Sequence, residues 1–125
     1  MDLLSEDKNF SFASLFLSGN PVGERAMYVS TPPPTWLDGE NMRELRLTVA
    51  GIYCLYFLVF SKSGGNACIT VNGREIRGSF REEERGEICG SAICSIRELA
   101  LPCSLGLSVS AEVECGILLV IRYEV

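Results

Sequence analysis

Six cysteines are the residues of this chain with the widest chemical repertoire. They stand in a sequence of 125 residues at Cys54, Cys68, Cys89, Cys94, Cys103 and Cys115. An even number of cysteines can indicate a disulfide framework, but such frameworks are typical of short secreted domains that lack a sufficient core. Hydrophobic residues make up 47% of this chain, so we favour buried thiols that pack as small hydrophobic groups. Thiols that stay exposed could cross-link chains on oxidation, and the candidates are Cys89, Cys94, Cys103 and Cys115.

The sequence offers little for catalysis. It contains no histidine, the commonest general base, and no Cys-x-x-Cys pair, so the spacing of a zinc site is missing. Among the thiols, Cys89 and Cys94 lie nearest to charged residues, but an activated cysteine requires an electropositive setting and this neighbourhood is acidic. We therefore predict no catalytic residue, no cofactor and no enzyme activity.

An acidic run at residues 81–87 is the strongest candidate for metal binding. Its carboxylates are Glu82, Glu83, Glu84 and Glu87. They could meet a calcium ion, but they lack the spaced Asp, Asn and Gly pattern of a dedicated calcium loop. We favour a solvated loop and predict no metal site.

Charge and hydropathy limit the partners and the place of synthesis. The net charge is −5 and the basic residues are scattered, which argues against a nucleic-acid footprint and against a polybasic membrane patch. The first residues, MDLLSEDKNFSF, are acidic where a secretory signal needs a basic segment and an apolar run. No apolar run is long enough to span a bilayer. We expect synthesis in the cytoplasm without a signal peptide.

The segment Leu45 to Phe60 organises the rest of the chain. Leu45, Leu47 and Val49 alternate with polar residues, as in a strand with one buried face. Residues 52–60 are then apolar on both faces, so both faces need a cover. A second sheet can cover one face, and another copy of the protein can cover the other.

Short strand patterns separated by turn residues fill the remainder of the sequence. We predict strands at residues 10–17, 26–30, 42–49, 52–60, 67–71, 74–79, 88–96, 105–113 and 117–125. Asn72-Gly73 is a strong hairpin signal, and Trp36, after three prolines, is expected to anchor its loop in the core. The pattern predicts a single all-β sandwich at residues 10–125 after a loosely ordered lead-in at residues 1–9.

The order of the motifs resembles the tumour necrosis factor-like jelly roll. Val49-Ala50-Gly51-Ile52-Tyr53 leads into the long apolar strand, and Val71-Asn72-Gly73 and Gly90-Ser91-Ala92 follow it. More narrowly, the chain is similar to the C-terminal domains of bacterial collagen-like spore-surface (exosporium) glycoproteins, which are related to the globular heads of complement proteins. The resemblance spans residues 12–125. Two departures are the missing Gly-X-Y repeat and the high cysteine content.

The resemblance implies an antiparallel two-sheet jelly roll that forms a homotrimer through apolar strand faces. The implied interface residues are Tyr53, Tyr56, Phe57, Leu58, Phe60, Leu118, Val120 and Tyr123. It also implies a non-enzymatic structural module of a bacterial cell or spore surface, in contact with itself and with other surface-layer proteins. The alternative is a trimeric binding module that recognises a receptor or a carbohydrate through loops at residues 31–40 and 81–87.

Overall fold

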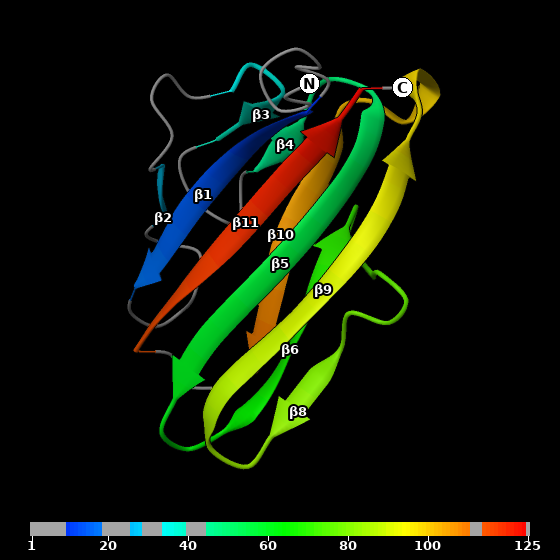
Figure 1. Ribbon diagram of the computed structural model, residues 1–125. Helices are drawn as coiled ribbons and strands as arrows, with labels where there is room; N and C mark the ends of the chain where they lie inside the picture. The colour runs from blue at the N-terminus through cyan, green and yellow to red at the C-terminus, as the bar shows by residue number, and fades with distance from the viewer. Residues whose placement is uncertain (1–9, 19–25, 29–33, 40–44, 111–113, 125) are drawn as a thin grey trace, which may run out of the picture.

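Two antiparallel sheets pack face to face in the computed structural model, which describes residues 10–18, 26–28, 34–39, 45–110 and 114–124. The strand order is β2-β1-β11-β5-β9 in one sheet and β3-β4-β10-β6-β7 in the other, where β8 also pairs with β6. We call them the front sheet and the back sheet, because the first faces the viewer in Figure 1. The two-sheet sandwich predicted from the sequence is thereby confirmed.

Long strands form the front sheet, and shorter strands form the back sheet. The front sheet contains β1 (Phe10–Ser18), β2 (Ala26–Tyr28), β5 (Gly51–Ser61), β9 (Gly86–Ile96) and β11 (Cys115–Tyr123). The back sheet contains β3 (Leu37–Asp38), β4 (Arg46–Leu47), β6 (Gly65–Val71), β7 (Arg74–Glu75), β8 (Arg81–Glu83) and β10 (Cys103–Ser110). Among the described residues the one helical element is a 3-10 turn, η1 (Glu98–Ala100), between β9 and β10.

The core lies between the sheets and is built by alternating side chains. On β5, Tyr53, Leu55 and Val59 are fully buried, because every second residue of a strand points to the same face. Side chains from the back sheet, among them Ile69 and Leu105, meet them from the other side. One buried aliphatic or aromatic side chain stabilises the fold by roughly 1.5–3 kcal/mol relative to exposure.

Trp36 is part of this core, as the sequence predicted. Its side chain is 4% exposed, and its ring lies edge-on to Tyr53 with the centroids 5.6 Å apart. The indole Nε1 donates a hydrogen bond to Ser11 Oγ at 2.6 Å. Trp36 therefore joins the segment before β3 to strands β1 and β5 of the front sheet.

The Asn72-Gly73 hairpin is confirmed between β6 and β7. Asn72 has φ of 53° and Gly73 has φ of 79°, the left-handed conformations that a two-residue hairpin turn requires. Asn72 also joins the turn to β10. Its backbone N–H donates to Ser104 O at 2.9 Å, and its Oδ1 accepts from Ser104 N at 2.9 Å.

The acidic segment at residues 81–87 differs from the predicted loop. Residues 81–83 form β8, which pairs with Gly65, Asn66 and Ala67 of β6, and β9 already begins at Gly86. Strand pairing uses backbone groups, so a fully exposed run of charged side chains can still form an edge strand. The charges themselves are exposed, as expected.

Several predicted strands have other bounds in the structure. The return strand expected at residues 74–79 ends at Glu75, because the buried Ser79 Oγ instead bonds the backbone of Ile69 and Ile76. The strand expected at residues 42–49 is seen at residues 46–47, and residues 42–44 lie outside the described part. Strand β10 begins at Cys103, two residues earlier than expected, and residues 111–113 also lie outside the description.

Candidate assembly face

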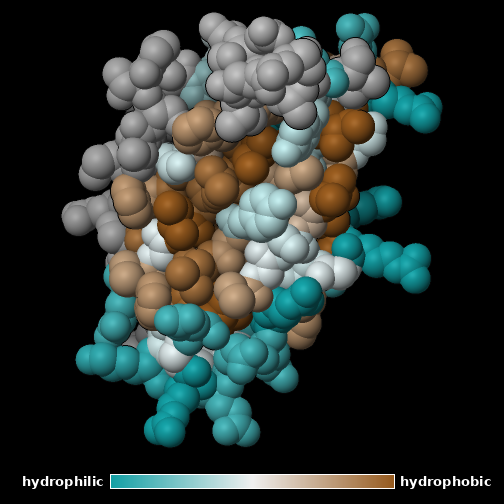
Figure 2. Space-filling view, in the orientation of Figure 1, coloured by the Kyte–Doolittle hydropathy of each residue, from teal (hydrophilic) through white to brown (hydrophobic). Residues whose placement is uncertain are grey.

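The front sheet has a second face, which points away from the core and which we call the outer face. It consists of Phe10, Phe12, Ser14 and Phe16 of β1, Ile52, Cys54, Tyr56, Leu58 and Phe60 of β5, Glu87, Cys89, Ser91, Ile93 and Ser95 of β9, and Cys115, Ile117, Leu119, Ile121 and Tyr123 of β11. Figure 2 shows this side of the molecule as a broad hydrophobic area that gives way to hydrophilic residues at the lower end.

The outer face is apolar to a degree that is unusual for a surface. Phe12, Phe16 and Tyr56 are 52%, 51% and 46% exposed, and Ile93 is 71% exposed. Among the outer-face residues just named, the one charged side chain is Glu87, at the lower end of β9. Contiguous apolar patches of more than a few hundred Å² are rare on monomers and mark interaction surfaces. The outer face therefore has the properties of a protein contact surface.

A depression lies at the lower end of the outer face. It has a volume of about 200 Å³ and is lined by Phe16, Leu58, Phe60, Cys115, Gly116 and Ile117. The backbones of β11 and β5 come close together here, because a Cβ on Gly116 would lie 2.8 Å from the carbonyl oxygen of Leu58. Glycine at this position lets the two strands pair without a clash.

The predicted interface residues divide between the two faces of the front sheet. Tyr56, Leu58, Phe60 and Tyr123 lie on the outer face. Tyr53, Phe57, Leu118 and Val120 lie inside the sandwich and are at most 3% exposed. The structure therefore corrects the placement of these four side chains. The back sheet covers them, so they cannot contact a second copy. The prediction grouped neighbours in the sequence, whereas consecutive strand residues point to opposite faces.

Other members of the outer face were not singled out from the sequence. The largest are Phe12 and Phe16 of β1, together with Ile117, Leu119 and Ile121 of β11. The signal that could have found Phe12 and Phe16 is the alternation with Ala13 and Leu15, which makes residues 10–17 apolar on both faces in the same way as β5.

The six cysteines fall into three settings, and all are free thiols. Cys89 and Cys115 are exposed, whereas Cys54, Cys68 and Cys94 are partly buried. Cys103 is fully buried, and desolvation raises the pKa of its thiol. The thiol of Cys94 faces the core, and desolvation by burial raises its pKa to about 11. Of the predicted cross-linking thiols, Cys89 and Cys115 are therefore accessible, Cys103 is corrected to a core residue, and Cys94 is partly buried and packs against the core.

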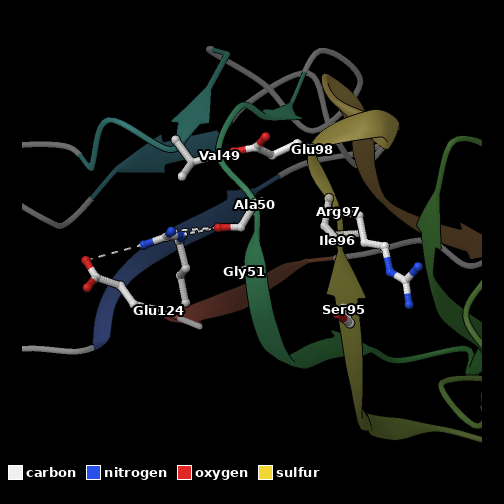
Figure 3. A pocket seen from close by; sticks show the side chains of 9 residues that line it. Val49, Ala50, Gly51, Ser95, Ile96, Arg97, Glu98 and Glu124 are labelled. Atoms are coloured by element: carbon white, nitrogen blue, oxygen red, sulfur yellow. Dashed lines mark hydrogen bonds and ion pairs between the residues drawn. The ribbon is translucent and has the colours of Figure 1, made fainter.

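A cavity of about 620 Å³ opens at the end of the sandwich where β9 and β11 finish. It is lined by Val49, Ala50, Gly51, Ser95, Ile96, Arg97, Glu98, Arg122 and Glu124. The guanidinium of Arg122 donates to Ala50 O from Nε at 3.1 Å and from Nη2 at 2.6 Å. Glu124 lies 3.8 Å from Nη1, and Arg97 extends to the side away from Glu124 (Figure 3). Opposite charges balance each other here, so the cavity has no clear preference for an anion or a cation.

The acidic segment also borders a shallow cup of about 380 Å³, lined by Ser63, Gly65, Glu82, Glu83 and Glu84. Within the described part of the chain, no group of three or more His, Cys, Asp or Glu side chains is arranged to hold a metal ion. Glu87, the fourth predicted carboxylate, belongs instead to β9. The described residues thus provide no metal-binding cluster.

The described segments contain no helix of sufficient length and apolar character to cross a membrane.

Two antiparallel sheets in this strand order define a jelly roll of the tumour necrosis factor type. The chain is similar to murine APRIL, with a TM-score of 0.64, 12% identity and coverage of 90% of this chain and 99% of that one. PRD1 vertex protein P5 gives a TM-score of 0.64 at 12% identity, covering 91% and 96%. Eiger TNF from S. frugiperda gives 0.53 at 10% identity, covering 91% and 93%.

At identities of 10–12%, these structural similarities establish the fold and not the activity. No protein-family model matches the sequence, and no curated protein does. The resemblance to a tumour necrosis factor-like jelly roll is thereby confirmed at the level of the fold. The narrower resemblance to spore-surface glycoproteins has no support in these comparisons.

Proposed function

We propose that this protein is a non-enzymatic structural module that assembles into a homotrimer through the outer face. The observation that carries the proposal is the composition of that face. Large exposed side chains such as Phe16, Tyr56 and Ile93 lie together on it, and its one charged residue is at the lower end. A second copy of this chain is a suitable cover, because it offers an equally apolar and uncharged surface.

A closed ring of three chains would cover the exposed edge of the front sheet as well as its outer face. Strand β9 is the edge strand there, and its residues 88–96 contain no charge. Long uncharged edges promote association between chains unless something covers them. In a cyclic trimer each contact is heterologous, so the β9 side of one chain meets the β1 side of the next, and three such contacts leave neither side open.

The mass of the assembly in solution tests this proposal. Light scattering on a sizing column, across a concentration series with reductant present, is expected to give three times the chain mass of 13.7 kDa. A mass of one chain at all concentrations would contradict the homotrimer. The outer face would then stay exposed to water without a second copy to cover it.

The place of assembly is proposed from the sequence resemblance. We infer a bacterial cell or spore surface layer, where this module would meet other surface-layer proteins after synthesis in the cytoplasm without a signal peptide. The similarity of the fold to a vertex protein supports a role in building an assembly. Immunogold labelling of sporulating and vegetative cells would test the location, and label confined to the cytosol in both would contradict it.

A binding module is the second candidate function, and one observation favours it. Leu99, in the η1 turn, is fully exposed beside the cavity that Arg97 and Glu98 line. Surface loops often carry recognition residues, and a fully exposed apolar side chain there gains free energy when a partner covers it. Of the two loops predicted from the sequence to carry recognition, residues 31–40 are described at residues 34–39, and residues 81–87 contain the exposed strand β8. Binding of the purified trimer on a glycan array, lost in Leu99→Ser, would favour this function over a purely structural one.

A further inference from the structure

Two exposed cysteines occupy the same face of the molecule. Cys89 of β9 and Cys115 of β11 both point outward from the front sheet and are exposed, and they are the two exposed members of the six. Cys54 is also on this face but is partly buried and lies nearer the start of β5, whereas Cys89 and Cys115 pair near its end. The pair therefore differs from the other thiols in both accessibility and position.

The register places the two cysteines near the same end of the sheet, with an offset of two residues along β5. Cys89 pairs with Leu58 of β5, and Cys115 pairs with Phe60 of the same strand. They lie on opposite sides of β5, because the strand order is β11-β5-β9. Two intervening strand spacings of about 4.8 Å, together with the offset along β5, keep them too far apart for a disulfide within one chain.

Three-fold symmetry limits which cysteines of neighbouring subunits can meet. A rotation about an axis preserves the height of every atom along that axis, so groups on neighbouring subunits can meet only if their heights agree. Cys115 lies two residues, about 7 Å, farther along β5 than Cys89 and two strand spacings to the side, so their heights agree when the axis is inclined to the strands by about 35° in the sense that cancels this offset. Each subunit of a cyclic trimer has two different contact sides, and the two cysteines lie one on each side of β5.

We propose that Cys89 of one subunit forms a disulfide with Cys115 of the next, and that three such bonds close the trimer covalently. This inference rests on the proposed homotrimer. Two different cysteines are necessary for the ring, because three copies of a single cysteine around an axis can form at most one pair. The bond requires the neighbouring Cα atoms to approach within about 7 Å.

The chemistry requires an external oxidant, and a small-molecule disulfide such as oxidised glutathione suffices. The thiolate of Cys115 attacks one sulfur of glutathione disulfide and releases one glutathione thiolate. The thiolate of the neighbouring Cys89 then attacks the Cys115 sulfur of this mixed disulfide and releases the second glutathione. The two cysteines lose two protons and two electrons, and glutathione disulfide is reduced to two thiols.

The two cysteines lie where an oxidant can reach them. Glu114, which precedes Cys115 in the sequence, forms an ion pair with Lys62 at 3.2 Å, and Glu87 lies two residues before Cys89. Charged groups thus border the outer face at this end, which is the hydrophilic lower end seen in Figure 2. The bonds would form at the rim of the trimer contact and not in its centre.

The test compares native mass with covalent mass in the full chain. Protein treated with oxidised glutathione, then alkylated, is run on a denaturing gel without reductant. Wild type is expected to migrate as a trimer, and Cys89→Ser and Cys115→Ser are each expected to migrate as monomers. Cys54→Ser and Cys68→Ser serve as matched controls and are expected to keep the covalent trimer. Peptide mass spectrometry is expected to identify the Cys89–Cys115 cross-link.

A mixed assembly makes the test sharper. When Cys89→Ser and Cys115→Ser chains are refolded together, each chain has one partner thiol, so covalent dimers containing one of each are expected and covalent trimers are not. A native trimer that stays monomeric on the gel after oxidation would overturn the disulfide ring while leaving the homotrimer intact. Covalent dimers of Cys89→Ser alone would overturn the pairing, and a monomeric native mass would overturn the homotrimer itself.

Discussion

Arg122 of β11 donates two hydrogen bonds to the backbone carbonyl oxygen of Ala50, 72 residues earlier in the chain. Its guanidinium thereby holds the residue before β5 against the end of β11. A Cβ on Gly51 would lie 2.9 Å from Tyr123 O and 3.0 Å from Arg122 Nε, so the glycine leaves room for this contact. The Ala50-Gly51 break in the sequence pattern is therefore the point where the entry to β5 is fastened to the last strand.

Arg122→Met is expected to destabilise the fold by about 2 kcal/mol, because hydrogen bonds from a charged donor contribute roughly 1.5–3 kcal/mol. Urea denaturation at a fixed protein concentration measures the change. The control is Arg97→Met, which removes an exposed arginine from the same cavity and is expected to change stability by less than about 0.5 kcal/mol. Equal effects of the two substitutions would show that the Ala50 contact contributes nothing.

Asn72→Ala is expected to weaken the β6–β7 hairpin by about 1–2 kcal/mol. The left-handed φ of 53° costs an alanine roughly 1 kcal/mol, and the N–H of Ser104 loses its acceptor. Asn72→Asp keeps both the acceptor oxygen and the tolerance for this conformation, so it is the conservative control. Urea midpoints of the two variants measure the difference, and an Asp variant as unstable as the Ala variant would refute this explanation.

Much of the fold was predictable because strand and turn signals are local. The apolar run at residues 52–60 correctly indicated a long strand, which the back sheet covers on one face, and the Asn72-Gly73 hairpin needed only its two turn residues. The charged strand β8 was not predictable in the same way. Its pairing with β6 depends on backbone groups brought together by the fold, and its side chains look like those of a loop.

The composition of the outer face was only half predictable, for a related reason. On β11, Leu118 and Val120 are as apolar as Ile117 and Leu119, so alternation alone cannot say which pair faces the core. The register does so, because it places Ile117 opposite Leu58 on the outward side. The same ambiguity applies to the cysteines, since Cys89 and Cys94 have similar neighbours in sequence but opposite orientations in β9.

Tyr56→Glu is expected to convert the proposed homotrimer to single chains. Tyr56 lies in the middle row of the outer face, between Leu119 of β11 and Ser91 of β9, so a carboxylate there would be buried without a partner on assembly. Light scattering with reductant present measures the mass. The control is Phe80→Glu, because Phe80 is 43% exposed but lies outside the outer face. A trimeric Tyr56→Glu protein would exclude the centre of the outer face from the contact.

Alkaline pH is expected to destabilise the fold through its buried thiols. Desolvation by burial raises the pKa of Cys94 to about 11 from an ordinary value of 9.0, with smaller contributions from Cys103 and Cys54. Between these two pKa values the unfolded thiol binds fewer protons than the folded one. The stability that the Cys94 thiol contributes is therefore complete below pH 9 and is lost as the pH rises towards 11. A single group contributes a slope of at most about 1.4 kcal/mol per pH unit.

Cys94→Ala should therefore flatten the fall in stability between pH 9 and pH 10.5, even though the substitution lowers stability at neutral pH. A remaining slope is expected, because burial also raises the pKa of Cys103 and of Tyr53. Urea denaturation with reductant, at one protein concentration and several pH values, measures both slopes. Cys89→Ala, which removes an exposed thiol, is the matched control and is expected to follow the wild-type curve. Parallel curves for wild type and Cys94→Ala would mean that the Cys94 thiol does not contribute to the alkaline loss of stability.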